Sequence, residues 1–157
     1  MNQNNLQIET ALAREDAIVA EHFYRMWLDL DFDPNSLVSN WQEITLKYID
    51  NARQNLKYRA FIAKIEDKIV GSASCQLFDG LYPSIIKAES RLYGYIWGVY
   101  VEKSYRDRGI GKQLTNQAID YLQSLGCTRA ILHASPRGQP VYDRLGFIAS
   151  NQMHLDL

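Results

Sequence analysis

Hydrophobic residues recur along the first third of the chain with strand spacing and then with helix spacing. Leu6, Ile8 and Thr10 alternate with polar residues, which predicts a first strand. Asp16 is placed to cap a helix. The predicted helix has one apolar face, made of Val19, Phe23, Met26, Trp27 and Leu30. A second helix is predicted from the capping box formed by Ser39 and Gln42.

The middle of the chain predicts three strands and one loop. Residues 58–65 and 68–78 form two apolar runs joined by a tight turn at Glu66 and Asp67, which is typical of a hairpin. Residues 79–89 contain Gly80 and Pro83 and are expected to form a loop. Residues 91–101 are rich in Tyr, Trp and Val and predict a third long strand.

The last third alternates helices with strands. Residues 109–125 predict a helix that ends at Gly126. Its apolar face consists of Ile110, Leu114, Ala118, Tyr121, Leu122 and Leu125. Residues 129–134 predict a short buried strand. Pro140 favours the start of a short helix that Gly146 ends, and residues 147–157 are expected to supply a last strand.

The expected element order is therefore β-α-α-β-β-β-α-β-α-β. The strand, helix and strand over residues 95–134 predict a right-handed crossover between parallel strands. The earlier hairpin makes the remaining strands antiparallel. We expect an α/β (α+β) fold, with a mixed, mostly antiparallel sheet flanked by helices, in a single domain over residues 1–157.

Composition narrows the classes of function. The 157 residues carry 17 Lys and Arg against 18 Asp and Glu, which argues against a nucleic-acid partner. No apolar run approaches the roughly 18 residues of a membrane span, and the polar residues 1–6 lack the apolar region of a signal peptide. We expect a cytoplasmic protein, monomeric or homodimeric, with no membrane partner. Cys75 and Cys127 lie in apolar runs without metal-ligand spacing, which favours two buried thiols and no metal.

The segment with the clearest chemistry follows the strand over residues 91–101. A short polar turn leads to Arg106-x-x-Gly109-x-Gly111, and a helical pattern begins at once. The first N–H groups of a helix have no internal partner, and the helix dipole is positive there. Glycines let a ligand approach the backbone closely. This arrangement predicts a phosphate-binding turn.

Two common phosphate loops do not match this turn. A P-loop requires Ser or Thr after its Gly-Lys, and Gln113 follows Lys112 here, while Arg106 stands at the position of the first glycine. The dinucleotide fingerprint requires a third glycine where Leu114 stands, and it normally follows the first strand of a fold. The remaining interpretation is an Arg-x-x-Gly-x-Gly loop after a long strand.

This loop resembles the pyrophosphate loop of the GNAT superfamily of acyl-CoA-dependent N-acetyltransferases. A second segment, Tyr142-Asp-Arg-Leu145-Gly146-Phe147, is similar to the Tyr-x-x-Leu-Gly-Phe segment of that family. The resemblance implies the same fold from end to end and acetyl-CoA as co-substrate. It also implies that Val99, Tyr100 and Val101 bind the pantetheine arm through their backbone, as an added strand would.

The resemblance also assigns the remaining cofactor contacts. It implies that N–H groups of the loop cradle the pyrophosphate, and that Lys103 and Arg108 are candidates for another phosphate. The loop residues are Arg106, Asp107, Arg108, Gly109, Ile110, Gly111 and Lys112. Ser135 stands where many members carry an Asn that touches CoA, although its position also suits a cap at the end of a strand.

Tyr142 corresponds to the family tyrosine that protonates the departing thiolate. A phenol has an ordinary pKa of about 10 and a free thiol about 8.5, so a hydrogen bond to the developing thiolate is favourable. Packing on the sheet is the alternative role for this side chain.

The general base has no match to the family pattern. The two positions where relatives carry Glu correspond to Tyr95 and Ala130 here. The candidates are His133, Glu89, Asp79 and Glu102. We choose His133, because an imidazole titrates near neutral pH, although a histidine in an apolar strand is often structural.

We therefore expect an enzyme that transfers an acetyl group from acetyl-CoA to a primary amine of a small molecule or amino acid, by direct attack in a ternary complex. A protein or peptide N-acetyltransferase is one alternative. A non-catalytic acyl-CoA sensor is another, favoured by the missing base. An aromatic set, Tyr82, Tyr93, Tyr95, Trp97 and Tyr100, is a candidate lining for the acceptor pocket.

Overall fold

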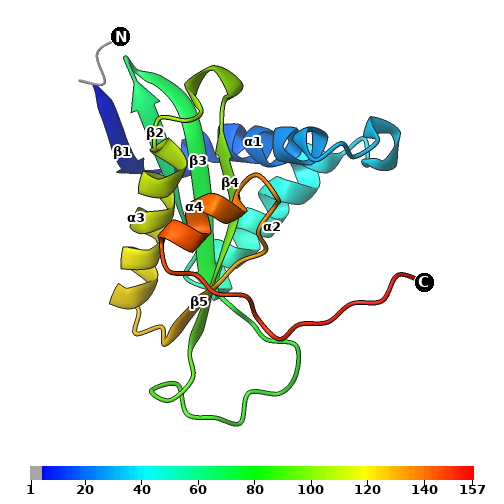
Figure 1. The fold of residues 1–157 in the computed structure, drawn as a ribbon, viewed down its shortest axis with the longest axis vertical. Helices are drawn as coiled ribbons and strands as arrows, with labels where there is room; N and C mark the ends of the chain where they lie inside the picture. Colours follow the sequence, from blue (N-terminus) through cyan, green and yellow to red (C-terminus); the bar gives the residue numbers. More distant parts are fainter. Residues whose placement is uncertain (1–4) are drawn as a thin grey trace.

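A five-stranded mixed sheet forms the centre of the computed structural model, which describes residues 5–157 (Figure 1). The strands, in their order across the sheet, are β1 (Leu6–Thr10), β2 (Arg59–Ile65), β3 (Lys68–Leu77), β4 (Tyr93–Val101) and β5 (Arg129–Ile131). Strands β1 to β4 pair antiparallel, and β5 runs parallel to β4. The predicted mixed, mostly antiparallel sheet is confirmed.

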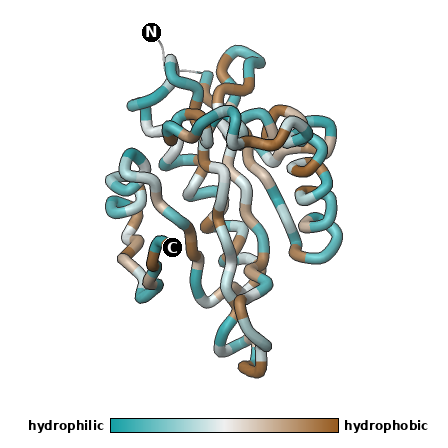
Figure 2. Tube along the Cα trace, turned by 90° about the vertical axis from the view of Figure 1, so that its right-hand side faces the viewer, coloured by the Kyte–Doolittle hydropathy of each residue, from teal (hydrophilic) through white to brown (hydrophobic). Residues whose placement is uncertain are grey.

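Helices cover both faces of this sheet. They are α1 (Asp16–Asp29), α2 (Trp41–Asn55), α3 (Ile110–Ser124) and α4 (Gln139–Arg144). One buried cluster joins α1 and α2 to the sheet through Val19, Ile49 and Ile62. A second cluster joins α3 to the opposite face. In Figure 2 the helices carry both teal and brown residues, as expected when one side of a helix faces the sheet.

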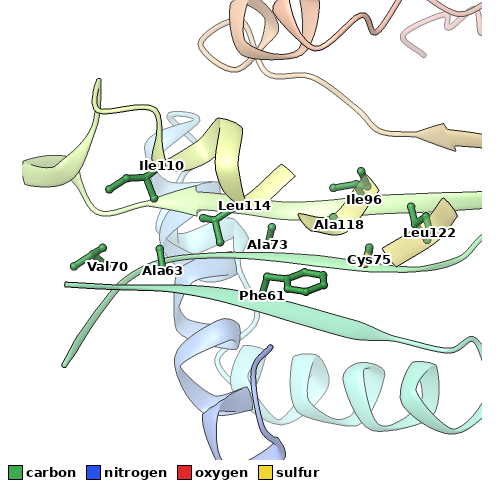
Figure 3. Packing of buried hydrophobic residues seen from close by; sticks show 10 residues of the cluster. All are labelled: Phe61, Ala63, Val70, Ala73, Cys75, Ile96, Ile110, Leu114, Ala118 and Leu122. Atoms are coloured by element: carbon green, nitrogen blue, oxygen red, sulfur yellow. The ribbon is translucent and has the colours of Figure 1, made fainter. Parts of the chain in front are cut away.

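The predicted apolar face of α3 is confirmed at four positions. Ile110, Leu114, Ala118 and Leu122 are buried at helical spacing (Figure 3). They pack on β-sheet side chains, namely Phe61, Ala63, Val70, Ala73, Cys75 and Ile96. Burying each large aliphatic side chain contributes about 1.5–3 kcal/mol. This packing fixes the position of the N-terminus of α3 against the end of β4.

One strand prediction was too long, and another was wrong. The strand expected over residues 129–134 ends at Ile131, and its residues are exposed or half-buried. Residues 147–157 form no strand. Phe147 packs against the core cluster, but Ile148, Met153 and Leu155 are exposed. The physical reason is that this segment runs away from β5, so its backbone meets no neighbouring strand edge (Figure 1).

A buried histidine lies between α1 and the sheet. His22 is fully buried, its Nδ1 lies 2.8 Å from Ser72 Oγ, and its ring centroid lies 5.0 Å from that of Tyr100. Its Nε2 has no partner among the described residues. Burial lowers the pKa of His22 to about 4, and the nearby Glu102 only partly opposes this.

We predict that His22 makes folding stability depend on pH between about 6.5 and 4. The unfolded chain binds a proton at His22 below pH 6.5, but the folded chain does not until about pH 4. The free energy of unfolding therefore falls as pH drops through this window, by roughly 3 kcal/mol in total. Urea unfolding at several pH values measures the fall.

The variant His22→Gln removes the buried imidazole, so its unfolding free energy should fall less steeply over the same window. His154→Gln is the control, because His154 is exposed. Identical pH slopes for the wild type and His22→Gln would contradict this assignment.

Candidate active site

The sheet opens between β4 and β5. These strands pair at only three positions, Tyr93 with Arg129, Gly94 with Ala130 and Tyr95 with Ile131. Strand β4 then continues to Val101. Within the described residues, the edge of β4 over residues 96–101 therefore has no strand neighbour on the β5 side. An edge of this kind can pair with an extended ligand that carries amide groups.

A β-bulge lies on β4 at this open edge. Ser74 opposes Trp97 while Ser72 opposes Tyr100, so Gly98 and Val99 together oppose a single residue of β3. Gly98 has φ of +62°, which a glycine adopts without strain. A bulge leaves its extra residue outside the ladder and redirects the backbone. An isolated glycine within a strand pattern is a signal for such a bulge.

The Arg106 side chain holds the turn that follows β4. Its Nε donates to the carbonyl oxygen of Val101 at 2.7 Å, and its guanidinium forms an ion pair with Asp29 of α1. Lys103 Nζ lies 3.2 Å from the same carboxylate. Arg106 therefore points back into the fold, and its side chain fixes the turn. Its own N–H makes a long bond of 3.4 Å to the Lys103 carbonyl.

The N-terminus of α3 follows this turn directly. Asp107 and Gly109 have φ of +62° and +76°, and Gly109 is the N-cap residue. No side chain caps the helix. The first N–H groups of α3, those of Ile110, Gly111 and Lys112, have no intrahelical acceptor and lie at the positive end of the helix dipole. This geometry suits a phosphate.

The two glycines of the loop serve different purposes. Gly109 needs to be glycine because of its positive φ. Gly111 has no such need, because a Cβ built there comes no closer than 3.9 Å to another atom, Val101 Cγ2. Alanine would also favour the helix. The protein's own packing therefore leaves open a space at Gly111 that a bound group can use.

Lys103 and Arg108, the candidates for contact with another phosphate, each contact other groups of the protein. Arg108 Nη2 donates to the Ser104 carbonyl at 3.0 Å, and the guanidinium lies over the Tyr105 ring. Lys103 pairs with Asp29. Both Lys103 and Arg108 are exposed, so these contacts are of the kind that exchanges readily with solvent.

Tyr142 lies on helix α4. Ser135 lies in the segment just before this helix. Ser135 Oγ accepts a hydrogen bond from the Gly138 N–H at 3.1 Å, so it acts as a cap in this structure. A Cβ at Gly138 would lie 3.0 Å from the Tyr142 ring. The Tyr142 ring packs edge-on against Phe147, and burial raises the pKa of its hydroxyl to about 12.

The structure brings His133 to Tyr95. His133 Nδ1 lies 2.7 Å from the Tyr95 hydroxyl, and the imidazole is exposed. Tyr95 belongs to the last β4–β5 pair, so this contact lies where the two strands separate. Both positions stand out in the sequence, but their contact does not. Because they are 38 residues apart, only the crossover through α3 brings them together.

The other candidate bases are placed differently. Glu102 forms an ion pair with Lys68 at 2.7 Å. Asp79 and Glu89 are exposed, and both lie on the loop between β3 and β4. Of the four candidates, His133 is the one that borders the separation of β4 and β5.

The predicted aromatic set does not form one cluster. Tyr100 is buried against His22, whereas Tyr82 is exposed and accepts a bond from Arg91. Trp97 packs between the sheet and α1 and α2, where its Nε1 donates to Gln76 Oε1 at 3.0 Å. Gln76 Nε2 in turn donates to Tyr48 at 3.0 Å. The sequence contains no signal that selects Gln76 or Tyr48 for this chain of contacts.

Neither thiol is activated. Cys75 is buried in the α3 cluster and burial raises its pKa to about 12, while burial also raises the pKa of the half-buried Cys127. Within residues 5–157 no group of three or more His, Cys, Asp or Glu side chains is placed to hold a metal ion. In the same range no helix is long and apolar enough to cross a membrane.

Comparison with known proteins identifies the class. The model of the Acetyltransferase (GNAT) family matches residues 15–147, so the chain belongs to this family. It is an acetyl-CoA-dependent acetyltransferase.

Individual relatives differ in what they acetylate. The chain is 36% identical over 106 residues to the glucosamine 6-phosphate N-acetyltransferase of Trypanosoma brucei brucei, covering 67% of this chain and 69% of that protein. It is 33% identical over 97 residues to the N-alpha-acetyltransferase MAK3 of Arabidopsis thaliana, covering 60% of this chain and 47% of that protein.

A solved structure shares the whole fold. A predicted acetyltransferase with acetyl-CoA from Clostridium acetobutylicum aligns with a TM-score of 0.81 and 22% identity, covering 97% of this chain and 95% of that one. The residues of the present site fit the same co-substrate. The open edge of β4 suits the amides of pantetheine, and the uncapped α3 with the space at Gly111 suits a pyrophosphate.

We predict that Gly111→Ala stabilises the fold but weakens the binding of acetyl-CoA. The added methyl has room in the protein and should raise the free energy of unfolding by about 0.5–1 kcal/mol. It should also weaken acetyl-CoA binding about tenfold, because it occupies the space beside the helix N–H groups. Thermal unfolding and titration calorimetry measure the two effects. Gln113→Ala, at an exposed position two residues further along α3, is the control for helix propensity.

An unchanged affinity of Gly111→Ala for acetyl-CoA would show that this loop does not bind acetyl-CoA.

We predict that Tyr142→Phe lowers kcat about 10²-fold and changes the KM for acetyl-CoA by less than about twofold. The hydroxyl matters only when negative charge develops on sulfur, so ground-state binding is spared. Steady-state thiol release measures both constants. Tyr121→Phe is the matched control, because it removes a hydroxyl that donates to the Lys57 carbonyl on the flank of α3. An unchanged kcat in Tyr142→Phe excludes the hydroxyl from the reaction.

Proposed function

We propose that this acetyltransferase acetylates the primary amine of a small molecule or amino acid, by direct attack within a ternary complex. The observation that carries this proposal is the contact between Tyr95 and His133 at the point where β4 and β5 separate. There, an open backbone edge that can hold an acyl-pantetheine adjoins an exposed imidazole that can take a proton.

The co-substrate is bound mainly by backbone groups in this proposal. Val99, Tyr100 and Val101 pair with the pantetheine arm on the open side of β4. The loop from Arg106 to Lys112 holds the pyrophosphate at the N-terminus of α3. A backbone N–H near the Gly98 bulge, where the ladder to β3 is interrupted, stabilises the oxyanion of the tetrahedral intermediate.

The reaction removes two protons from the substrate ammonium and stabilises one negative charge. One ammonium proton goes to His133, directly or through water, and the nitrogen lone pair then attacks the thioester carbonyl carbon. The nitrogen of the tetrahedral intermediate releases the second proton to water, the C–S bond breaks, and CoA leaves as a thiolate. The products are an amide and CoA, and no acyl-enzyme forms. The raised pKa values of Cys75 and Cys127 are consistent with this direct route.

The geometry of His133 sets a requirement on its tautomer. If Nδ1–H donates to the Tyr95 oxygen, Nε2 is left as the acceptor that a base requires. Tyr95 is then a positioning residue that orients the imidazole. The proposal assigns this tautomer to the resting enzyme.

Tyr142 acts as a hydrogen-bond donor to the thiolate. With its pKa raised to about 12, complete transfer of its proton to a thiolate of pKa about 8.5 is unfavourable by roughly 5 kcal/mol. The hydroxyl remains protonated throughout the neutral range, so it can always donate. Its contribution is electrostatic, and the thiolate is protonated by solvent after it departs.

A small acceptor is favoured over a peptide by the balance of the relatives. The glucosamine 6-phosphate N-acetyltransferase shares more of its length with this chain than MAK3 does. We propose that the loop between β3 and β4 covers this small acceptor. Arg91 lies over the Tyr93 ring and donates to Tyr82, which orders one end of the loop beside the paired ends of β4 and β5.

A panel of amines tests the proposed acceptor class. Thiol release from acetyl-CoA is measured with glucosamine 6-phosphate, glucosamine, free amino acids and tetrapeptides with free N-termini. We expect at least one small amine to exceed every peptide about tenfold or more in kcat/KM. His133→Gln should reduce that rate about 10²-fold.

Three results would overturn the proposal. A preference for tetrapeptides would make the protein a peptide acetyltransferase. Calorimetric binding of acetyl-CoA with no thiol release on any amine would make it a sensor. Loss of turnover in a folded Cys75→Ala, Cys127→Ala double variant would contradict direct attack.

A further inference from the structure

A chain of three hydrogen-bonded side chains crosses the face of the sheet that α2 covers. Trp97 of β4 donates its indole Nε1–H to Gln76 Oε1 of β3 at 3.0 Å, and Gln76 Nε2 donates to the Tyr48 hydroxyl of α2 at 3.0 Å. Gln76 is buried, at 4% exposure, whereas Tyr48 is 50% exposed. The chain of contacts therefore begins inside the fold and ends at its surface.

The donor groups fix the direction of every proton along this chain. An indole nitrogen only donates, so the Gln76 group that faces Trp97 must be the carbonyl oxygen. The group that faces Tyr48 is then the NH2 group, which also only donates. The Tyr48 oxygen accepts this bond, so its own proton points away from Gln76. The buried amide thus makes the half-exposed Tyr48 an outward-facing hydrogen-bond donor.

This donor lies close to the proposed acceptor site. Gln76 and Tyr95 are paired directly across β3 and β4, so their side chains leave the sheet on the same face. Trp97 shares that face, because it follows Tyr95 by two residues on one strand. The rings of Tyr48 and Trp97 lie 5.5 Å apart. Burial raises the pKa of the Tyr95 hydroxyl, and the nearby Tyr48 hydroxyl raises it further.

Tyr95 therefore lies between a hydrogen-bond donor and the proposed base. On the β3 side it adjoins Gln76, which holds Tyr48. On the β5 side its hydroxyl lies 2.7 Å from His133 Nδ1. The rings of Tyr95 and Trp97 are half-buried, so a small molecule can lie against them with one end toward His133 and the other toward Tyr48.

We propose that Tyr48 is a specificity-determining residue, whose hydroxyl donates to an oxygen of the acceptor while the amine of the acceptor lies at His133. This inference rests on the proposed function and narrows its substrate class. The preferred acceptors are amines that carry a hydroxyl or carboxyl oxygen, and plain alkylamines are poor acceptors. A donor that is held in place discriminates in this way, because an analogue without the oxygen leaves it unpaired. Gln76 is a positioning residue that keeps the Tyr48 proton directed at the acceptor.

Paired amines test the role of Tyr48. Glucosamine is paired with cyclohexylamine, and alanine with ethylamine, so that each oxygen-bearing amine has an oxygen-free analogue. Tyr48→Phe should lower kcat/KM for glucosamine, alanine or both by about three- to tenfold, and for either analogue by less than about twofold. The pair that responds identifies the recognised oxygen as hydroxyl or carboxyl. Each amine is compared with itself in the wild type, so differences in amine basicity cancel.

Tyr58→Phe is the matched control. The Tyr58 hydroxyl lies 2.9 Å from Ser74 Oγ, and its ring lies 6.1 Å from that of Trp97, but the side chain is buried. The control removes a phenol hydroxyl beside the same indole without removing an outward-facing donor. It should therefore leave the preference within each pair of amines unchanged.

Gln76→Met tests the positioning role, because it keeps the length of the side chain and removes the amide. It should raise the KM for the oxygen-bearing acceptor about threefold, with kcat unchanged, and leave the KM for the oxygen-free analogue as it is. A merely structural role of Gln76 would change the constants for both members of a pair.

A binding measurement separates this inference from the proposed function. The indole N–H resonance of Trp97, assigned with Trp97→Phe, is followed by NMR while each amine is added to the CoA complex. Glucosamine or alanine should shift this resonance, and Tyr48→Phe should need about three- to tenfold more of that amine for the same shift. A shift of this kind without turnover of any amine would support the role of Tyr48 and overturn the proposed reaction.

Two results would overturn the role of Tyr48 and leave the proposed reaction standing wherever an amine is turned over. Tyr48→Phe could lower kcat/KM equally for both members of each pair, or for neither, which would show that the hydroxyl does not recognise an oxygen. Alternatively, none of the four amines shifts the Trp97 resonance, which would show that they do not bind on this face of the sheet.

Discussion

The early end of the pairing between β4 and β5 is the constraint on which the site depends. A strand edge must find hydrogen-bond partners, and residues 96–101 of β4 find none on the β5 side within the described chain. The Gly98 bulge lies within this stretch and interrupts the ladder to β3 as well. The backbone of β4 is therefore prepared for an amide-bearing ligand before any side chain is considered. The family to which the chain belongs uses acetyl-CoA, and pantetheine supplies such amides.

The second requirement is a fixed relation between this edge and the N-terminus of α3. Leu114 and Leu122 bury the helix against the sheet, and Arg106 connects the turn to both Val101 and α1. The unpaired N–H groups of the helix are thus held in line with the open edge. The groups that face this opening are backbone N–H groups, so a bulkier residue at Gly111 would fill the space beside them.

The sequence predicted most of the fold because helix and strand periodicities reflect local burial. The apolar spacing of α3, the hairpin and the glycine turn before α3 are all visible as patterns among residues that are near in sequence. The length of β5 and the path of residues 147–157 were missed, since a strand pattern shows that a segment can pair but not which edge it meets. The contact between Tyr95 and His133 could not be predicted either, because it depends on the register of a parallel pair formed across α3. The Gln76 contacts are equally nonlocal.

Backbone amide hydrogen exchange with and without CoA tests the central claim most directly. The account predicts that CoA slows exchange in two separate segments, the β4 residues around Val99 and Val101 and the first turn of α3 from Ile110 to Lys112. Exchange in β2, which lies two strands away, should stay unchanged. Saturating CoA that protects neither β4 nor the start of α3 would contradict the claim that this opening in the sheet holds the co-substrate.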